Sequence, residues 1–305
     1  MILFVSGRCD IPAFYMKWFM NRLAAGYVDV RNPFNEHQIS RVLLNEDMID
    51  CLSFCTKNPI PMLPYLDAIK LPYFVQVTLT PYHCDIERHV PDKRTILQAV
   101  KTMAEKLGKD RVMVRYDPIL LNDRYTVAYH QRAFHQLLKE MSGYLDTCII
   151  SFVDLYKNTR ANQPLMRMKD ITADDIHALC VSFQKDAALY GFRIQTCAES
   201  KMDLRCYDIY DRSCVELEAV QKLCGKKLHY RNLPGVRKQL CACLPTVDIG
   251  DYNACAHECL YCYANYNAQV IRRRMAEHDP NSSVLLGHVA EEDTITIRKD
   301  YKKKR

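Results

Sequence analysis

Short apolar runs rich in β-branched residues alternate with amphipathic segments through the first 200 residues of the chain. The runs predict strands at residues 2–6, 28–30, 48–54, 74–79, 112–116, 148–153 and 193–197. Between them, apolar residues recur at helical spacing, as at Ile96, Val100 and Met103. This β–α–β order predicts an α/β protein with a parallel sheet, in which only residues 28–30 are expected to pair locally, with residues 40–44.

Polar and charged residues follow most of the predicted strands. These residues are Arg8, Asp10, Asn32, Lys57, Asn58, Thr78, Thr80, Arg115, Asp117, Asp154 and Glu199. A parallel barrel carries its active site at the carboxyl ends of its strands. We therefore predict a TIM-barrel-like parallel barrel, complete or partial, over residues 1–240. A cysteine-rich segment over residues 241–278 would close it, and residues 279–305 would form a loosely attached basic tail.

The run Cys255-Ala-His-Glu-Cys259-Leu-Tyr-Cys262 spaces three cysteines as C-x3-C-x2-C. Three thiolates can hold three irons of a [4Fe–4S] cluster and leave the fourth open, whereas electron-transfer clusters normally fill every iron with cysteine. This spacing resembles the fingerprint of radical S-adenosylmethionine (SAM) enzymes, in which an aromatic residue at the position of Tyr261 packs near the adenine. Zinc is the alternative, although His257 as a ligand would crowd a tetrahedral shell between Cys255 and Cys259.

An extended segment at residues 246–250 precedes the cysteine run, and a predicted helix at residues 266–277 follows it. This is the order of the first strand–loop–helix unit of a radical SAM barrel, placed here near the end of the chain. The usual fold would therefore need a circularly permuted chain, with residues 246–250 inserted beside the first strand. A Gly-Gly-Glu-type motif, which binds the SAM amine in that superfamily, does not follow the predicted helix.

Four further cysteines lie upstream on three segments: Cys197, Cys214, Cys241 and Cys243. Together they can fully ligate an auxiliary [4Fe–4S] cluster. Zinc competes for such a closed set of thiolates, and a role without metal stays open. The cofactors expected from the sequence are therefore one or two [4Fe–4S] clusters and SAM.

Fifteen cysteines are many for a chain whose start lacks the features of a signal peptide. The sequence also has no apolar run near the ~20 residues that span a bilayer, so we expect a cytoplasmic protein that binds no membrane. In that compartment, clustered cysteines serve metal binding or catalysis rather than disulfides. The net charge of +6 comes partly from residues 302–305, so charge gives only a weak reason to expect nucleic-acid binding.

Several short motifs occur in a fixed order along the chain. They are Ser6-Gly-Arg-Cys-Asp-Ile-Pro-Ala-Phe-Tyr15, Arg31-Asn-Pro-Phe34, Thr56-Lys-Asn-Pro59, Thr78-Leu-Thr-Pro-Tyr82, Arg115-Tyr-Asp-Pro-Ile-Leu-Leu-Asn122, Ser151-Phe-Val-Asp-Leu-Tyr156, Thr196-Cys-Ala-Glu199 and the stretch 248–265. In this order the chain resembles the bacterial domain-of-unknown-function 1848 family over roughly residues 1–266. The resemblance implies a C-terminal cysteine cluster like that of radical SAM proteins and gives no substrate. Cys55 stands where the family usually has Trp, so the packing beside Thr56 and Lys57 is expected to differ.

The leading hypothesis is a radical SAM-type enzyme in which Cys255, Cys259 and Cys262 hold the cluster and SAM binds its open iron. Reductive cleavage of SAM would then start radical chemistry on an unidentified small-molecule or macromolecular substrate. The candidate catalytic residues are Arg115, Asp117, Lys57 and Glu199, and the candidate cofactor contacts are Tyr261, Arg8 and Asn253. A ferredoxin- or flavodoxin-type electron donor is the expected partner. For Arg115 and Asp117, a local ion pair that fixes the loop is an equal alternative.

Two other functions stay open. One is an iron–sulfur protein that transfers electrons or senses redox state without SAM. The other is a zinc-stapled barrel that binds nucleotides or nucleic acid through a basic stretch. The basic residues concerned are Lys226, Lys227, Arg231, Arg237 and Lys238.

Overall fold

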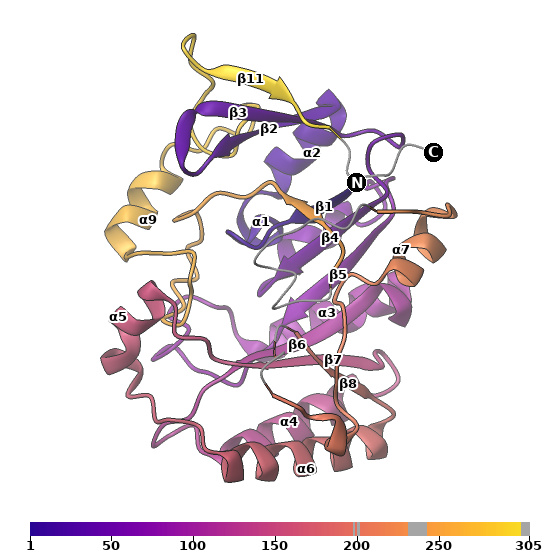
Figure 1. Ribbon diagram of the computed structural model, residues 1–305, viewed down its shortest axis with the longest axis vertical. Helices are drawn as coiled ribbons and strands as arrows, with labels where there is room; N and C mark the ends of the chain where they lie inside the picture. The colour runs from indigo at the N-terminus through magenta and orange to yellow at the C-terminus, as the bar shows by residue number, and fades with distance from the viewer. Residues whose placement is uncertain (198, 200–201, 231–242, 300–305) are drawn as a thin grey trace.

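The computed structural model describes the chain except for residues 198, 200–201, 231–242 and 300–305 (Figure 1). Its main element is an eight-stranded sheet in the order β10–β1–β4–β5–β6–β7–β8–β9, and every neighbouring pair is parallel. The strands are β1 (Ile2–Val5), β4 (Cys51–Thr56), β5 (Tyr73–Thr78), β6 (Val112–Ile119), β7 (Thr147–Phe152), β8 (Arg193–Thr196), β9 (Tyr210–Asp211) and β10 (Thr246–Asp248). The predicted α/β architecture with a parallel sheet is confirmed. In the part of the chain that the structure describes, β9 and β10 are the two edges of this sheet, and a closed barrel is not seen.

The last strand of the large sheet in sequence, β10, lies next to the first strand, β1, at one edge of the sheet. β10 pairs with β1, with Thr246 opposite Ile2 and Asp248 opposite Phe4. β1 in turn pairs with β4 on its other side. The predicted insertion of residues 246–250 beside the first strand is therefore confirmed, and it brings the cysteine run to the end of β1.

Helices cover one face of the large sheet. They include α2 (Met16–Ala25), α3 (Lys93–Leu107), α4 (Val127–Met141) and α6 (Ala173–Tyr190). Buried side chains from these helices, such as Phe19, Val100 and Phe134, share one core with the strand residues Leu3 and Val75. Burial of each such side chain contributes about 1.5–3 kcal/mol, so this face supplies most of the stabilising apolar contact. Figure 1 shows α4 and α6 side by side along the β7–β8 end of the sheet.

The other face of the sheet changes from apolar to polar along the strands. Near the strand starts, Ile2, Cys51 and Phe74 pack against Val220 of α7 (Leu217–Cys224). Because successive side chains in a strand alternate between faces, the residues two positions further on, including Ser53 and Gln76, point to this same side. These two polar side chains are buried. This face therefore becomes a polar surface toward the carboxyl ends of the strands.

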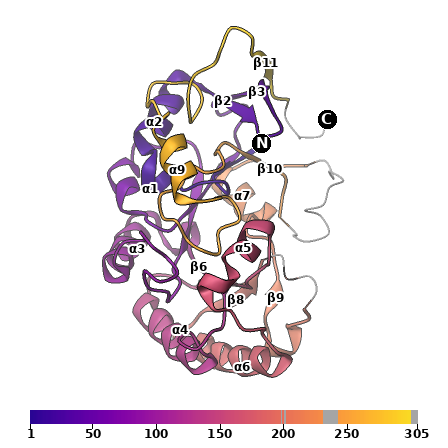
Figure 2. The ribbon, with the colours of Figure 1, turned by 90° about the vertical axis from the view of Figure 1, so that its left-hand side faces the viewer.

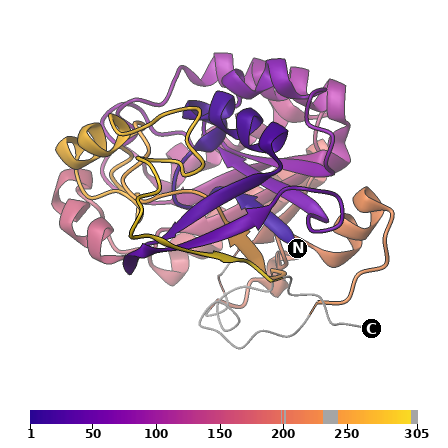
Figure 3. The same ribbon diagram turned by 90° about the horizontal axis from the view of Figure 1, so that it is seen from above.

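A separate small sheet has the order β11–β3–β2. β2 (Tyr27–Asn32) pairs antiparallel with β3 (Asn35–Leu43), so the expected local pairing of residues 28–30 is confirmed. β11 (Thr294–Ile297) pairs parallel with β3, as Figure 3 shows. The loose attachment expected for residues 279–305 is wrong for the described residues of that segment. Its residues Leu285 and Leu286 join the main core, and Trp18 Nε1 donates to the carbonyl of Ser282 at 2.9 Å. The division into three units is otherwise still a prediction.

The remaining helices in the described part of the chain are short. They are α1 (Ile11–Phe14), α5 (Lys157–Met166), α9 (Ala268–Met275) and the 3-10 turns η1 (Ile60–Tyr65), η2 (Lys109–Arg111) and η3 (Arg205–Tyr207). Figure 2 shows α5 and α9 on the same side of the molecule. Among the described residues, the helices are all too short or too polar to cross a bilayer.

Candidate functional site

The cysteine run starts where β10 meets the end of β1. Asp248 accepts hydrogen bonds from Ser6 Oγ at 2.8 Å and from the Gly7 N–H at 2.7 Å. Gly250 packs so closely here that an added Cβ would lie 2.0 Å from Ser6 Oγ. Only glycine fits at this position without displacement, and the close packing fixes the direction in which the chain enters the loop.

The loop closes on itself at Asn253. This residue has a left-handed φ of 56°, a conformation that asparagine tolerates better than most residues. Its N–H donates to the Ala264 carbonyl at 3.0 Å, and its Oδ1 accepts from the Tyr266 N–H at 2.7 Å. The predicted cofactor contact Asn253 thus joins the two ends of the loop.

Two neighbouring segments clamp the loop from the sides. The Leu260 N–H donates to the Ile86 carbonyl at 3.0 Å, and the His89 N–H donates to the His257 carbonyl at 3.1 Å. On the other side, Asn158 and Asn162 of α5 donate to loop carbonyls at 2.8–3.0 Å. The backbone of the run is therefore held at a defined place beyond the carboxyl end of β5.

The thiols of Cys255, Cys259 and Cys262 occupy one electrostatic neighbourhood. Burial raises the pKa of Cys255, and Asp10, Cys262 and Cys259 raise it further. Burial also raises the pKa values of Cys259 and Cys262, while Lys57 acts in the opposite direction on both. Without a metal these thiols therefore hold their protons, which metal binding would have to displace.

A buried charge network lies against Cys259. The Lys57 ammonium is 2.6 Å from the fully buried Glu87 carboxylate, which also pairs with Lys93. Tyr261 OH and Thr80 Oγ1 donate to Glu87 Oε1. Burial opposes the charge on Lys57, but the Glu87 carboxylate outweighs it and raises the Lys57 pKa. The network thus keeps a cation beside the cysteine sulfurs.

Asp10 connects the loop to the end of β1. Its Oδ2 accepts from the Lys57 N–H at 2.7 Å and lies 3.1 Å from His257 Nε2. The other ring nitrogen of His257 faces the His89 carbonyl at 3.3 Å. Both nitrogens of His257 therefore have partners other than the loop cysteines, so it supports the loop rather than completing a zinc shell in this arrangement.

The second cysteine group also comes together in part. Cys214 Sγ lies 3.0 Å from Cys197 Sγ, and the Cys214 N–H donates to Cys243 Sγ at 3.2 Å. Arg115 Nη1 lies 3.3 Å from Cys214 Sγ. The fourth predicted ligand, Cys241, lies outside the described residues, as do Arg231, Arg237 and Lys238 of the basic stretch.

Arg115 connects this group to the polar face of the sheet. Its Nε donates to Asp117 at 2.9 Å, and its Nη1 donates to Gln76 Oε1 at 2.7 Å. Ser151 Oγ donates to the other oxygen of Asp117. The local ion pair that the sequence offered as an alternative is present, and the guanidinium also reaches the cysteines.

Glu199 lies after β8, where its Oε1 accepts the Phe152 N–H at 2.7 Å. Burial raises the pKa of this carboxyl to about 7, and the charges of Asp154 and Asp117 add to the effect. A carboxyl with such a pKa can exchange a proton at neutral pH. Arg8 lies at the rim instead, where Nη1 donates to the Gly250 carbonyl at 3.4 Å and the guanidinium stands 5.4 Å from the Tyr252 ring centroid.

The sequence did not single out Glu87, Lys93 or Gln76 as site residues. Both charged residues follow Thr78 and Thr80, the polar residues noted at the end of β5. Glu87 lies in the loop after that strand, and Lys93 is the first residue of α3. Gln76 lies inside the otherwise apolar strand β5, and an isolated polar residue at such a position could have indicated a site residue. In the part of the chain that the structure describes, three or more His, Cys, Asp or Glu side chains are nowhere grouped so as to hold a single metal ion.

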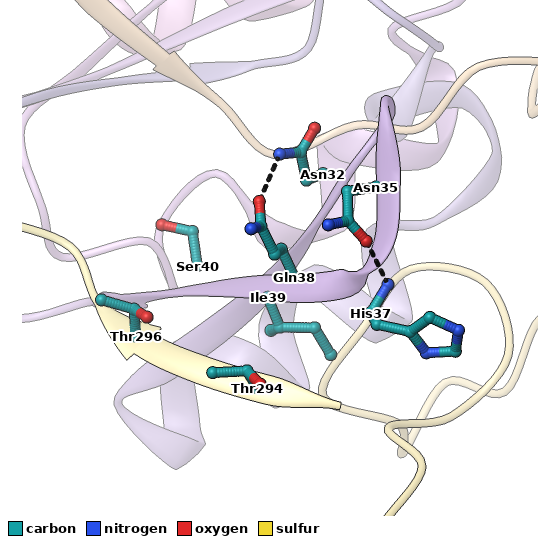
Figure 4. Close-up of a pocket in the computed structure, with 8 residues that line it drawn as sticks. All are labelled: Asn32, Asn35, His37, Gln38, Ile39, Ser40, Thr294 and Thr296. Atoms are coloured by element: carbon teal, nitrogen blue, oxygen red, sulfur yellow. Dashed lines mark hydrogen bonds between the residues drawn. The ribbon is translucent and has the colours of Figure 1, made fainter. Parts of the chain in front are cut away.

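A further pocket lies on the small sheet, where Asn32 Nδ2 donates to Gln38 Oε1 at 3.0 Å (Figure 4). Its lining comes from β2, β3 and β11 and consists of Asn32, Asn35, His37, Gln38, Ile39, Ser40, Thr294 and Thr296. Except for Ile39 these residues are polar, and His37 Nδ1 lies 3.2 Å from Asp293 Oδ1.

The fold and the two cysteine groups define an α/β protein with a polar, thiol-rich surface at the carboxyl ends of a parallel sheet. The chain belongs to the DUF1848 family, a domain of unknown function, whose match covers residues 2–264. The match therefore spans the large sheet and the whole cysteine run. The search of curated proteins and the search of solved structures each found no match.

Proposed function

We propose that this protein is an iron–sulfur enzyme of the radical SAM type, built on a partial parallel barrel. The observation that carries the proposal is the placement of Cys255, Cys259 and Cys262. The permuted strand β10 delivers them beyond the end of β1, and they share one neighbourhood beside Lys57. When bound there, a [4Fe–4S] cluster with an open iron supplies the electron that cleaves SAM reductively.

The residues present are compatible with such a group. Three thiolates and sulfides concentrate negative charge, and the Lys57 ammonium, fixed by Glu87, offsets part of it. The loop backbone is anchored on two sides, so the thiols need not be ordered at the moment of binding. Tyr261, in the loop itself, lies beside Lys57, with the ammonium 5.3 Å from its ring centroid.

The polar face of the sheet supplies the remaining functions. Arg115 has its guanidinium engaged by Asp117 and Gln76, so it would pair with a carboxylate of SAM or substrate only by exchanging those hydrogen bonds. Glu199 can take or give a proton at neutral pH, since its pKa is about 7. Arg8 and Asn253 lie where β1 and the loop meet and would border the cofactor. The substrate is unassigned, and the electron donor would be of the ferredoxin or flavodoxin type.

The test is anaerobic reconstitution followed by iron and sulfide analysis and a SAM cleavage assay. We expect release of 5′-deoxyadenosine after reduction with dithionite, and loss of about four irons per chain in Cys259→Ala. Cys84→Ala is the matched control because Cys84 is exposed. Full iron content in Cys259→Ala would refute the ligand assignment. A cluster without SAM cleavage would refute the enzyme and leave the electron-transfer or redox-sensing alternative.

A further inference from the structure

Three cysteines from distant segments meet at the polar face of the sheet, apart from the C-x3-C-x2-C run. Cys197 follows β8, Cys214 follows β9, and Cys243 precedes β10. Cys214 contacts both of the others: its sulfur is 3.0 Å from Cys197 Sγ, and its N–H donates to Cys243 Sγ at 3.2 Å. Cys214 is buried, and the other two are partly exposed.

The separation of the sulfurs indicates which metal centre fits. A disulfide would need about 2.05 Å. Two thiolates on one zinc ion, each at about 2.3 Å in a tetrahedral shell, stand about 3.8 Å apart. Thiolates that bind different irons of a cube lie further apart, because a cluster edge separates their metals. The observed 3.0 Å between Cys197 and Cys214 is therefore closer to a shared single ion than to two corners of a cube.

The charge at this place also favours an ion with several thiolates. Zn²⁺ with three thiolates has a net charge of about −1. Arg115, whose side chain is largely buried, reaches Cys214 Sγ at 3.3 Å and supplies the opposite charge. Asp117 and Gln76 fix the orientation of that guanidinium through three hydrogen bonds. A hydrogen bond from a fixed donor to a ligating sulfur is the outer support that metal sites use.

We propose that Cys197, Cys214 and Cys243 bind one zinc ion that links the end of the sheet to the segment before β10. Binding would release the three thiol protons to solvent as three zinc–sulfur bonds form, leaving one tetrahedral position for a fourth ligand. As the structure stands, the three described side chains do not enclose a single ion, so those of Cys197 and Cys243 would have to rotate toward Cys214 to bind it. The site is independent of the iron–sulfur proposal.

The experiment is metal analysis of protein purified anaerobically in the presence of zinc. We expect one zinc per chain in the wild-type protein and in Cys259→Ala, and less than a tenth of that in Cys214→Ala. Cys84→Ala, which removes an exposed thiol, should keep its zinc. Iron is measured in the same samples, so failure of the iron–sulfur proposal would appear as absent iron while the zinc result stands.

A second measurement covers the case in which Cys214→Ala does not fold. The metal-free wild-type protein is titrated with Co²⁺, and its cysteines are then alkylated and mapped by mass spectrometry. We expect thiolate-to-cobalt charge-transfer absorption and protection of the three cysteines only when metal is present. Unchanged zinc in Cys214→Ala, iron and sulfide that persist in Cys259→Ala, or a metal-free Cys197–Cys214 disulfide would each overturn the proposal.

Discussion

Replacing Glu87 with glutamine tests whether the charge network beside Cys259 is a real source of stability. The Glu87 side chain is fully buried between the Lys57 and Lys93 ammonium groups. Burial opposes its ionisation, but the two lysines outweigh that effect and lower its pKa from 4.5 to about 2. This fall corresponds to about 3 kcal/mol of folding free energy. The usual cost of breaking a buried ion pair, about 3–5 kcal/mol, is of the same size.

The pH dependence gives this prediction a sign. Because the pKa of Glu87 is lower in the folded than in the unfolded chain, its stabilisation is complete above about pH 4.5 and is lost as the pH falls toward 2. We therefore expect Glu87→Gln to lower the free energy of unfolding by about 3 kcal/mol at pH 7 and by about 1 kcal/mol at pH 3. Lys93→Met should cost less, because Lys57 remains beside the carboxylate.

The assay is urea unfolding of the metal-free protein at the two pH values, with the midpoint and slope fitted together. The exposed residue Glu291 provides the matched control, and Glu291→Gln should leave the unfolding curve in place. A loss below about 1 kcal/mol at pH 7, or a loss that stays constant down to pH 3, would refute the reasoning.

Three further predictions concern other parts of the fold. Burial lowers the pKa of His130 to about 4, so this histidine is neutral in the folded protein. Folding stability is therefore lost as the pH falls below 6.5, the pKa of the unfolded chain, and we expect a loss of about 2 kcal/mol between pH 7 and pH 5. Urea unfolding should show that His130→Gln largely removes this pH dependence. Gly250→Ala would place a Cβ 2.0 Å from Ser6 Oγ, so it should lower the unfolding free energy by about 1–3 kcal/mol, and an unchanged urea midpoint would contradict the close packing of β10 on β1. Trp18 is the one tryptophan of the chain and is buried under residues 282–284, so deleting residues 279–305 should shift its fluorescence emission to the red, and unchanged emission would count against that packing.

Short apolar runs were enough to predict β1 and β4 to β8 of the large sheet and the local pairing of β2 with β3, but not the two-residue edge strand β9. Those strands follow from local patterns, because parallel strands that are buried on both faces, such as β5 and β7, read as short continuous apolar runs. The insertion of β10 beside β1 followed from a different signal, the strand–loop–helix order around the cysteines. The pattern could not show whether the sheet closes, because closure depends on pairing between strands far apart in the chain.

The sequence analysis wrongly predicted a loose attachment of residues 279–305, because the polar composition of this segment gives no sign of its contacts with the core. Residues 279–305 contain charged and small polar residues, yet Leu285 and Leu286 join the core and β11 adds to β3. The buried network around Glu87 was missed for a related reason. A lone charged residue in a loop after a strand is usually solvated, and only the fold brings Lys57 and Tyr261 to it.

The reversal at β10 explains why two parts of the chain more than 240 residues apart can form one site. Asp248 caps the turn after β1, and a few residues later the chain reaches the loop cysteines while Asp10 contacts His257. Shortly before β10, Cys243 lies beside Cys214. β10 thus lies between the two cysteine groups, and a metal ion at either end would hold this edge strand in register. Loss of either ion is therefore expected to speed amide hydrogen exchange of residues 246–248, which can be measured in Cys214→Ala and Cys259→Ala while the other metal stays bound.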